Sequence, residues 1–128
     1  MSVLIRGIGL DIVELERVAR LDARNAKFRE RILSSAELQN YEKMNGHRKT
    51  EYLAGRFAAK EAFSKARGTG IGNDCSFLDI EVLSEPSGRP ILYFRQQPIN
   101  GFISITHTQT VAAAQVILMD EGSDTSKL

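Results

Sequence analysis

The sequence predicts a single α+β domain in which strands at both ends of the chain flank a helical middle. Apolar side chains recur with the 3.6-residue period of a helix in the middle of the chain, whereas alternation with period two indicates strands near the start and after residue 77. The connections between the later strands are short, which favours antiparallel pairing. We therefore expect a largely antiparallel sheet with a long central helix.

Composition narrows the classes of function. The 128 residues suffice for one domain, expected over residues 1–120, followed by a polar tail at 121–128 that we expect to be disordered. A formal net charge of +1 argues against a general nucleic-acid or membrane binder. No stretch is apolar enough to span a bilayer, no signal-peptide pattern is visible, and the single Cys75 cannot form an intrachain disulfide, so we expect a cytoplasmic protein with a structural Cys75.

The first strand is predicted over Val3 to Leu10, and one of its faces is nearly bare. Gly7 and Gly9 share that face and would let another group press against the backbone just before Asp11. Asp11 follows, and it has two interpretations. It is either the N-cap of a helix that begins at about Ile12, or one carboxylate of a site for a hard cation such as magnesium, since no Cys or His cluster has metal-ligand spacing.

A helical pattern runs from Val13 to Leu33, with a possible break between Asp22 and Asn25. Basic residues recur along it at spacings of three and four: Arg17, Arg20, Arg24, Lys27 and Arg31. The stripe is either a solvated helix face or a docking surface for an acidic helix. Ser34 to Glu37 then reads as a capping box, which starts a helix ending near Met44.

A basic cluster follows the turn at Asn45 and Gly46. It comprises His47, Arg48 and Lys49, and Arg56 lies two turns later. Such a cluster is either solvated or holds a terminal phosphate. Neither His47 nor His107 has a carboxylate at a short fixed spacing, so the sequence assigns neither as a general base.

The central helix places a carboxylate in an apolar stripe. Steps of about 100° put the following residues on one side: Ala54, Phe57, Ala58, Glu61, Ala62 and Lys65. Glu61 is therefore expected to be partly buried and to need a cation, which is either Lys65 at i+4 or a metal ion. The loop at residues 67–72 contains three glycines, which indicate either a helix C-cap or a phosphate-binding loop.

Four strands are predicted after residue 77. Leu78, Ile80 and Val82 alternate with acidic residues, and a turn follows at Pro86 to Pro90. The later strands are expected at Ile91 to Phe94, Gly101 to Ile105 and Val111 to Met119, with a turn from His107 to Thr110.

Three segments carry a family resemblance: GIGLDIVELERV, AGRFAAKEAFSKARGTGIG and SITHTQTVAAAQV. Over Ile5 to about Leu118 the chain resembles the holo-[acyl-carrier-protein] synthases, the small bacterial 4'-phosphopantetheinyl transferases. The resemblance implies the 4'-phosphopantetheinyl transferase fold and a magnesium-dependent transfer of 4'-phosphopantetheine from coenzyme A to a serine of apo acyl carrier protein, in fatty acid biosynthesis. Adenosine 3',5'-bisphosphate would be released.

The resemblance also implies roles for individual residues. Asp11 and Glu61 match metal-binding carboxylates, and Lys65 matches a lysine beside the diphosphate. Positions matching the coenzyme A pocket are Arg48, Arg56, His107 and the loop from Gly68 through Gly70 to Gly72. Three candidates stay open for the base that deprotonates the carrier serine, namely Glu61, Glu37 and a water bound to the metal, which we favour. His47 and Val111 depart from the residues common in relatives.

The resemblance further implies a homotrimer with sites at subunit interfaces, and an acidic acyl carrier protein as the partner of Arg17, Arg24 and Lys27. Two other hypotheses use the same residues. A magnesium-dependent nucleotide hydrolase would break down coenzyme A without an acceptor protein, and a non-catalytic module would only bind coenzyme A.

Overall fold

The computed structural model describes residues 4–120. The elements, in chain order, are β1 (Leu4–Glu14), α1 (Leu15–Arg24), α2 (Lys27–Ile32), α3 (Ser35–Glu42), α4 (His47–Arg67), the 3-10 helix η1 (Phe77–Asp79), β2 (Ile80–Ser84), β3 (Pro90–Phe94), β4 (Gln97–Pro98), β5 (Gly101–His107) and β6 (Val111–Asp120). The expected tail at 121–128 and the first residue of the expected strand, Val3, lie outside the described residues. No helix within residues 4–120 is long and apolar enough to cross a membrane.

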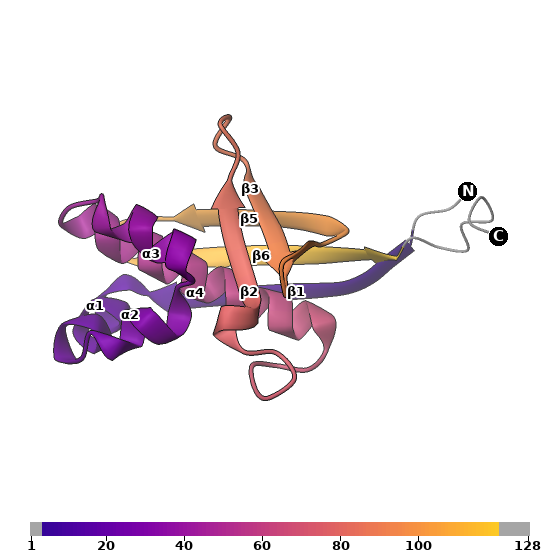
Figure 1. Ribbon diagram of the computed structural model, residues 1–128, viewed down its shortest axis with the longest axis horizontal. Helices are drawn as coiled ribbons and strands as arrows, with labels where there is room; N and C mark the ends of the chain where they lie inside the picture. Colours follow the sequence, from indigo (N-terminus) through magenta and orange to yellow (C-terminus); the bar gives the residue numbers. More distant parts are fainter. Residues whose placement is uncertain (1–3, 121–128) are drawn as a thin grey trace.

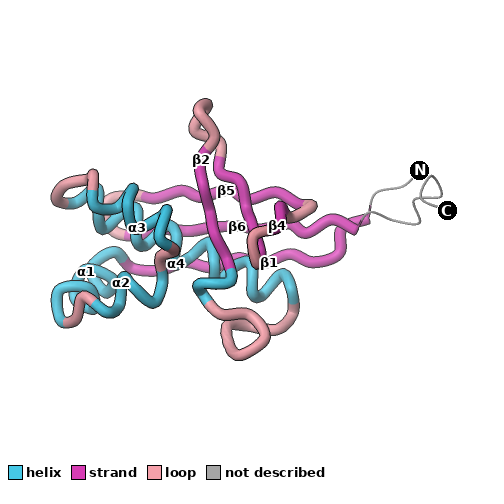
Figure 2. Tube along the Cα trace, in the orientation of Figure 1, coloured by secondary structure: helices cyan, strands magenta, loops and turns pink. Residues whose placement is uncertain are grey.

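The strands form two antiparallel sheets. The first has the order β1-β6-β5, and the second has the order β2-β3-β4. The β2–β3 hairpin crosses the strands of the first sheet, and α1, α2 and α3 gather at the end away from the termini (Figures 1 and 2). The α+β class, the long central helix and the antiparallel pairing are confirmed. The division into two sheets and the short β4 were not predicted.

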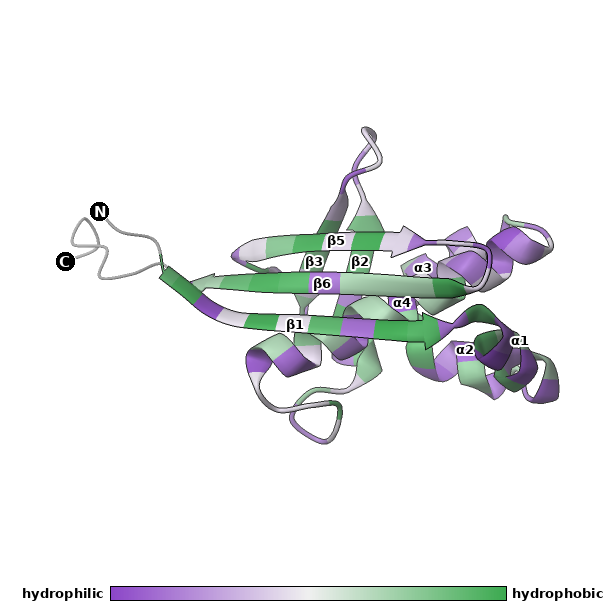
Figure 3. Cartoon of the chain, turned by 180° about the vertical axis from the view of Figure 1, so that it is seen from behind, coloured by the Kyte–Doolittle hydropathy of each residue, from purple (hydrophilic) through white to green (hydrophobic). Residues whose placement is uncertain are grey.

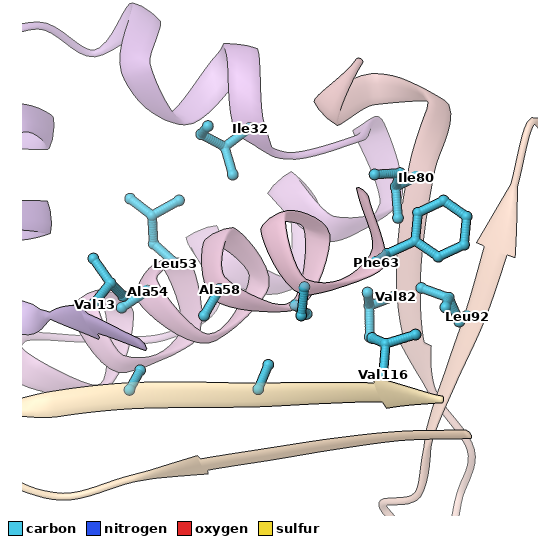
Figure 4. Packing of buried hydrophobic residues seen from close by; sticks show 14 of the residues in the cluster. Val13, Ile32, Leu53, Ala54, Ala58, Phe63, Ile80, Val82, Leu92 and Val116 are labelled. Atoms are coloured by element: carbon cyan, nitrogen blue, oxygen red, sulfur yellow. The ribbon is translucent and has the colours of Figure 1, made fainter. Parts of the chain in front are cut away.

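Helix α4 packs against the inner face of the first sheet, with its closest contact on β1. A Cβ added at Gly7 or Gly9 would overlap the carbonyl oxygen of Ala66 or Ala62, respectively. The predicted close approach to the bare face of the strand is therefore confirmed, and α4 is its cause. The alanines of α4 contribute to a core completed by larger side chains such as Leu53 and Phe63 (Figure 4).

Several boundaries differ from the prediction. Strand β1 continues to Glu14, so Asp11 lies inside the strand and is not a helix N-cap; the N-cap of α1 is Glu14, which makes no capping hydrogen bond through its side chain. The break in the first helical segment falls at Asn25 and Ala26. Leu78 belongs to η1 rather than to a strand, and its side chain is exposed.

The predicted capping box at Ser34 is present, and its glutamate has a second task. Glu37 Oε1 accepts a hydrogen bond from Lys60 Nζ at 2.6 Å, and Oε2 accepts one from the Val82 backbone N–H at 2.7 Å. Lys60 Nζ also donates to the carbonyl of Ile32. Both side chains are 0% exposed, so this buried ion pair fastens α2, α3 and β2 to α4.

The outer face of the first sheet is apolar and bears no helix of residues 4–120. Figure 3 shows β5, β6 and β1 in front of the helices, with much of β1 hydrophobic. The exposed side chains on this face include Ile8, Leu10, Ile12 and Phe102, and Ile12 is 66% exposed. A contiguous exposed apolar surface of this kind indicates an interaction surface.

The close contact of β1 with α4 predicts the effect of a single added methyl group. Gly9→Ala should lower the free energy of unfolding by about 3 kcal/mol, because the new Cβ would overlap helix backbone, which cannot move as a side chain could. Urea denaturation followed by circular dichroism measures this change. The matched control is Gly72→Ala, where no atom lies within 4 Å of the added Cβ. An equal loss in both variants would contradict the steric explanation.

Candidate active site

The predicted carboxylates meet where β1 crosses α4. Asp11 lies on the same face of β1 as Gly7 and Gly9, and that face is directed toward α4. Lys65 Nζ donates to Asp11 Oδ1 at 2.9 Å and to the carbonyl of Leu10 at 3.1 Å. Glu61 stands one helical turn before Lys65 and is partly buried, as predicted. The expected i,i+4 pair of Glu61 with Lys65 is replaced by the contact of Lys65 with Asp11.

The electrostatics of the site formed by Asp11, Glu61 and Lys65 favour a cation. Burial raises the pKa of Glu61, the negative charge of Asp11 raises it further, and Lys65 opposes both effects. A raised pKa means that ionised Glu61 costs free energy at neutral pH, and that this cost disappears as the pH falls below the usual pKa of 4.5. One lysine does not fully offset two carboxylates, so an added cation would stabilise their ionised forms.

The carboxylate ligands offered by Asp11 and Glu61 fit magnesium better than a transition metal. Among residues 4–120, no three His, Cys, Asp or Glu side chains are grouped as a metal site. Magnesium needs only one or two carboxylates, because it keeps several waters and takes its remaining ligands from substrate phosphates. Asp11 and Glu61 therefore fit a site that is completed by a phosphate-bearing substrate.

A second cluster lies at the beginning of α4. The carboxylate of Glu51 lies 3.3 Å from His107 Nδ1, 3.7 Å from His47 Nε2 and 3.7 Å from Arg48 Nη1. His107 is the last residue of β5, so this contact joins the sheet to α4. The sequence analysis did not single out Glu51. Its spacing to His47 and Arg48 is a visible helical signal, but its contact with His107 depends on the tertiary fold.

Arg56 is largely buried between α4 and β2. Its guanidinium stacks on the ring of Tyr52 at 4.2 Å, and Nη2 donates to the carbonyl of Val82 at 3.3 Å and to Ser84 Oγ at 3.4 Å. Burial lowers the pKa of Arg56, which the nearby Tyr52 and Glu37 partly counteract. Arg56 thus brings a positive charge to the part of β2 that leads into the turn of the β2–β3 hairpin.

The glycine loop after α4 is a helix C-cap in this structure. Gly68 and Gly70 have positive φ angles of 91° and 68°. The backbone N–H groups of Gly68, Thr69 and Gly70 all donate to the carbonyl of Ser64. The cap interpretation is therefore confirmed. Contacts of Gly68 and Gly70 with coenzyme A stay a prediction that rests on the resemblance, because these amides already have partners.

The comparisons with known proteins show the family to which the chain belongs. Residues 7–117 match the family model described as ACPS: 4'-phosphopantetheinyl transferase superfamily. The chain belongs to this superfamily. The holo-[acyl-carrier-protein] synthase of Listeria monocytogenes (serotype 4a, strain HCC23) is 51% identical over 116 residues, covering 90% of this chain and 98% of the relative. That of Bacillus subtilis (strain 168) is 52% identical over 116 residues, covering 90% and 96%.

Solved structures of superfamily members have the same fold. A holo-(acyl-carrier-protein) synthase from Bacillus anthracis, in complex with CoA (3',5'-ADP), superposes with a TM-score of 0.83 at 46% identity, covering 94% of this chain and 100% of that chain. The Helicobacter pylori protein, in complex with coenzyme A, gives a TM-score of 0.76 at 35% identity, covering 87% and 98%.

The remaining residues singled out by the sequence are either exposed on the surface or buried in the core. All five basic residues of the stripe are exposed on α1 or α2: Arg17, Arg20, Arg24, Lys27 and Arg31. Glu37 lies inside the core with both carboxylate oxygens hydrogen-bonded, so it cannot serve as the base that deprotonates the carrier serine next to Asp11 and Glu61. Burial raises the pKa of Cys75, which is consistent with a structural thiol.

The two clusters stand apart along α4. Glu51 and Glu61 are ten residues apart in one helix, which corresponds to about 15 Å of helical rise. The structure therefore brings Asp11, Glu61 and Lys65 together, and separately gathers Arg48 and His107.

Proposed function

We propose that this chain transfers 4'-phosphopantetheine from coenzyme A to a serine hydroxyl of apo acyl carrier protein, in the cytoplasm and in the service of fatty acid biosynthesis. The products are holo acyl carrier protein and adenosine 3',5'-bisphosphate. The observation that carries the proposal is the arrangement of Asp11, Glu61 and Lys65 across the contact of β1 with α4. Relatives about half identical to nearly the whole chain are holo-[acyl-carrier-protein] synthases.

The geometry suggests a role for each side chain. Asp11 and Glu61 would hold magnesium, which supplies positive charge next to the diphosphate when it is bound. Lys65 moves its ammonium from Asp11 to the transferring phosphoryl group and keeps that group in place for attack. The serine oxygen forms the new bond to phosphorus, and the bond from phosphorus to the adenosine bisphosphate oxygen breaks. The serine proton is transferred to a base next to Asp11 and Glu61.

The nucleotide end of coenzyme A requires further cations. Arg48, Arg56 and His107 are the candidates, and the position of Arg56 near the turn of the β2–β3 hairpin favours contact with an anion beside that hairpin. Gly68 and Gly70 have no side chain, so the substrate could approach the backbone next to Lys65 closely. The separation of these cations from Asp11 and Glu61 argues that one substrate is held by residues from two subunits.

The assembly proposal follows from that separation and from the apolar outer face of the first sheet. Side chains such as Ile8, Leu10 and Ile12 are exposed in the isolated chain, and covering them would stabilise an oligomer. The resemblance indicates a homotrimer, in which the carboxylates of one subunit face the nucleotide-binding residues of its neighbour.

The decisive assay is intact-protein mass spectrometry of apo acyl carrier protein incubated with this chain, coenzyme A and magnesium. We expect a mass gain of one phosphopantetheine, abolished by a chelator. Glu61→Gln should reduce the rate at least about 1,000-fold without unfolding the protein, because one carboxylate cannot replace two at the diphosphate. The control Glu42→Gln changes an exposed carboxylate on α3 and should retain the activity.

The other outcomes identify the rival functions. Breakdown of coenzyme A without an acceptor protein would indicate a hydrolase. Saturable binding of coenzyme A with no modified carrier protein would indicate a binding module. Full activity of Glu61→Gln would overturn the metal-binding role.

A mixing experiment tests whether the sites are shared. At coenzyme A concentrations well below KM, Glu61→Gln and His107→Ala should each have little activity alone. Coexpression in equal amounts should then restore about a quarter of the wild-type activity, because random trimers contain some intact interfaces. Specific activity is measured on the purified mixture, and sedimentation gives the number of subunits. If both residues served the same subunit's site, the mixture would show no such gain.

The basic stripe predicts selectivity for the protein substrate. Reversing Arg17 and Arg24 to Glu should raise KM for acyl carrier protein by about tenfold or more, with little change in KM for coenzyme A, because exposed charges chiefly steer the charged partner. The control is Lys43→Glu, which reverses an exposed charge outside the stripe and should leave both KM values unchanged. Equal rises in both KM values would point to a folding defect, and added salt should reduce the wild-type advantage.

A further inference from the structure

Glu51 is an acidic residue at the centre of an otherwise basic cluster. Its carboxylate side chain is 17% exposed, whereas those of His47, Arg48 and His107 around it are 59%, 54% and 39% exposed. The carboxylate is therefore the inner group of the cluster, and the nitrogen-bearing side chains form its outer rim. A ligand approaching from solvent would meet the rim first.

The contacts use both oxygens of Glu51. Oε1 lies 3.7 Å from Arg48 Nη1, and Oε2 lies 3.3 Å from His107 Nδ1 and 3.7 Å from His47 Nε2. His107 comes from the end of β5, whereas the other members lie in the first turns of α4. Glu51 thus contacts side chains that come from two different elements.

We propose that Glu51 is a positioning residue that aligns Arg48 and His107 on a terminal phosphate group of the nucleotide substrate. This inference rests on the proposed function, since it assumes that the cluster receives the nucleotide end of coenzyme A. Glu51 does not touch the phosphate. It acts through the side chains that do.

The chemistry explains why a carboxylate belongs in an anion site. Exposed side chains such as Arg48 lose rotamer freedom when they are fixed on a phosphate. A carboxylate in contact with them before the phosphate arrives reduces the freedom that is lost on binding. Contact of Glu51 with Nδ1 of His107 also leaves Nε2, on the other side of the ring, for a substrate oxygen.

A purely structural role is the alternative, because Glu51 also links α4 to β5. The two roles predict different kinetics. Loss of a link would lower the free energy of unfolding and disturb binding of both substrates. Loss of alignment would weaken binding of the nucleotide substrate alone. Turnover at saturation would stay nearly unchanged, because Glu61 lies about 15 Å further along α4, with Asp11 of β1 beside it.

The test compares Glu51→Gln, Glu51→Asp and the control Glu42→Gln. Calorimetry measures Kd for adenosine 3',5'-bisphosphate, and steady-state kinetics give kcat and both KM values. Glu51→Gln should raise that Kd, and KM for coenzyme A, by about five- to tenfold, while kcat and KM for carrier protein stay within about twofold. Glu51→Asp should recover part of the loss, because it keeps the charge. The control should behave as the wild type.

A double-mutant cycle with His107→Gln tests whether Glu51 acts through its neighbour. The effect of Glu51→Gln should shrink to about two- to threefold in the His107→Gln background, because only the contact of Glu51 with Arg48 is then left to lose. Additive effects, an unchanged Kd in Glu51→Gln, or parallel losses in kcat and both KM values would each overturn the inference. If the wild-type chain itself neither bound the nucleotide nor modified carrier protein, the proposed function would fail instead.

Discussion

The site depends on how closely the backbone of β1 approaches the backbone of α4. Gly7 and Gly9 leave no side chain between them and the helix, and Ala62 and Ala66 present the matching small surface. Since successive residues of a strand alternate between faces, Asp11 must point to the same side as these glycines. The close approach therefore carries Asp11 to Glu61 and Lys65 from a strand more than 50 residues earlier in the chain. The contact of Asp11 with Lys65 is a direct consequence of the absence of two Cβ atoms.

Glu37, which packs against α4, and Glu61, which lies in α4, have different roles because their hydrogen-bond partners differ. Glu37 is fully buried and has Lys60 and backbone N–H groups as partners, so its charge is satisfied within the chain and belongs to the scaffold. Glu61 is only partly buried, and its pKa is raised by burial and by Asp11. A charge that the fold leaves incompletely compensated is available to a ligand, whereas a compensated charge is not. This contrast distinguishes the site of Asp11 and Glu61 from the structural ion pair of Glu37 with Lys60.

Much of the architecture could be predicted because it depends on local patterns. The period of α4, the capping box at Ser34 and the bare face of β1 were all visible in the sequence, and so were Asp11 and Glu61 as candidates. The end of β1 was misplaced because Ile12, an apolar residue on the outer face, resembled the start of a helix. Lys60 and Glu51 were missed for a different reason. Their partners, Glu37 and His107, lie 23 and 56 residues away, and only the tertiary fold brings them together.

The apolar outer face and the separated clusters have one physical explanation if the functional unit is larger than one chain. A small domain has little interior in which to enclose a substrate as long as coenzyme A, so a second chain would be needed to complete the site. Burial of an apolar sheet face such as that of Ile8 and Leu10 would supply free energy of association, and in the proposed homotrimer the neighbouring subunit would contribute the other cluster. Catalysis would in that case depend on protein concentration through assembly, since a dissociated chain would hold the carboxylates and the nucleotide-binding cations in different, incomplete sites.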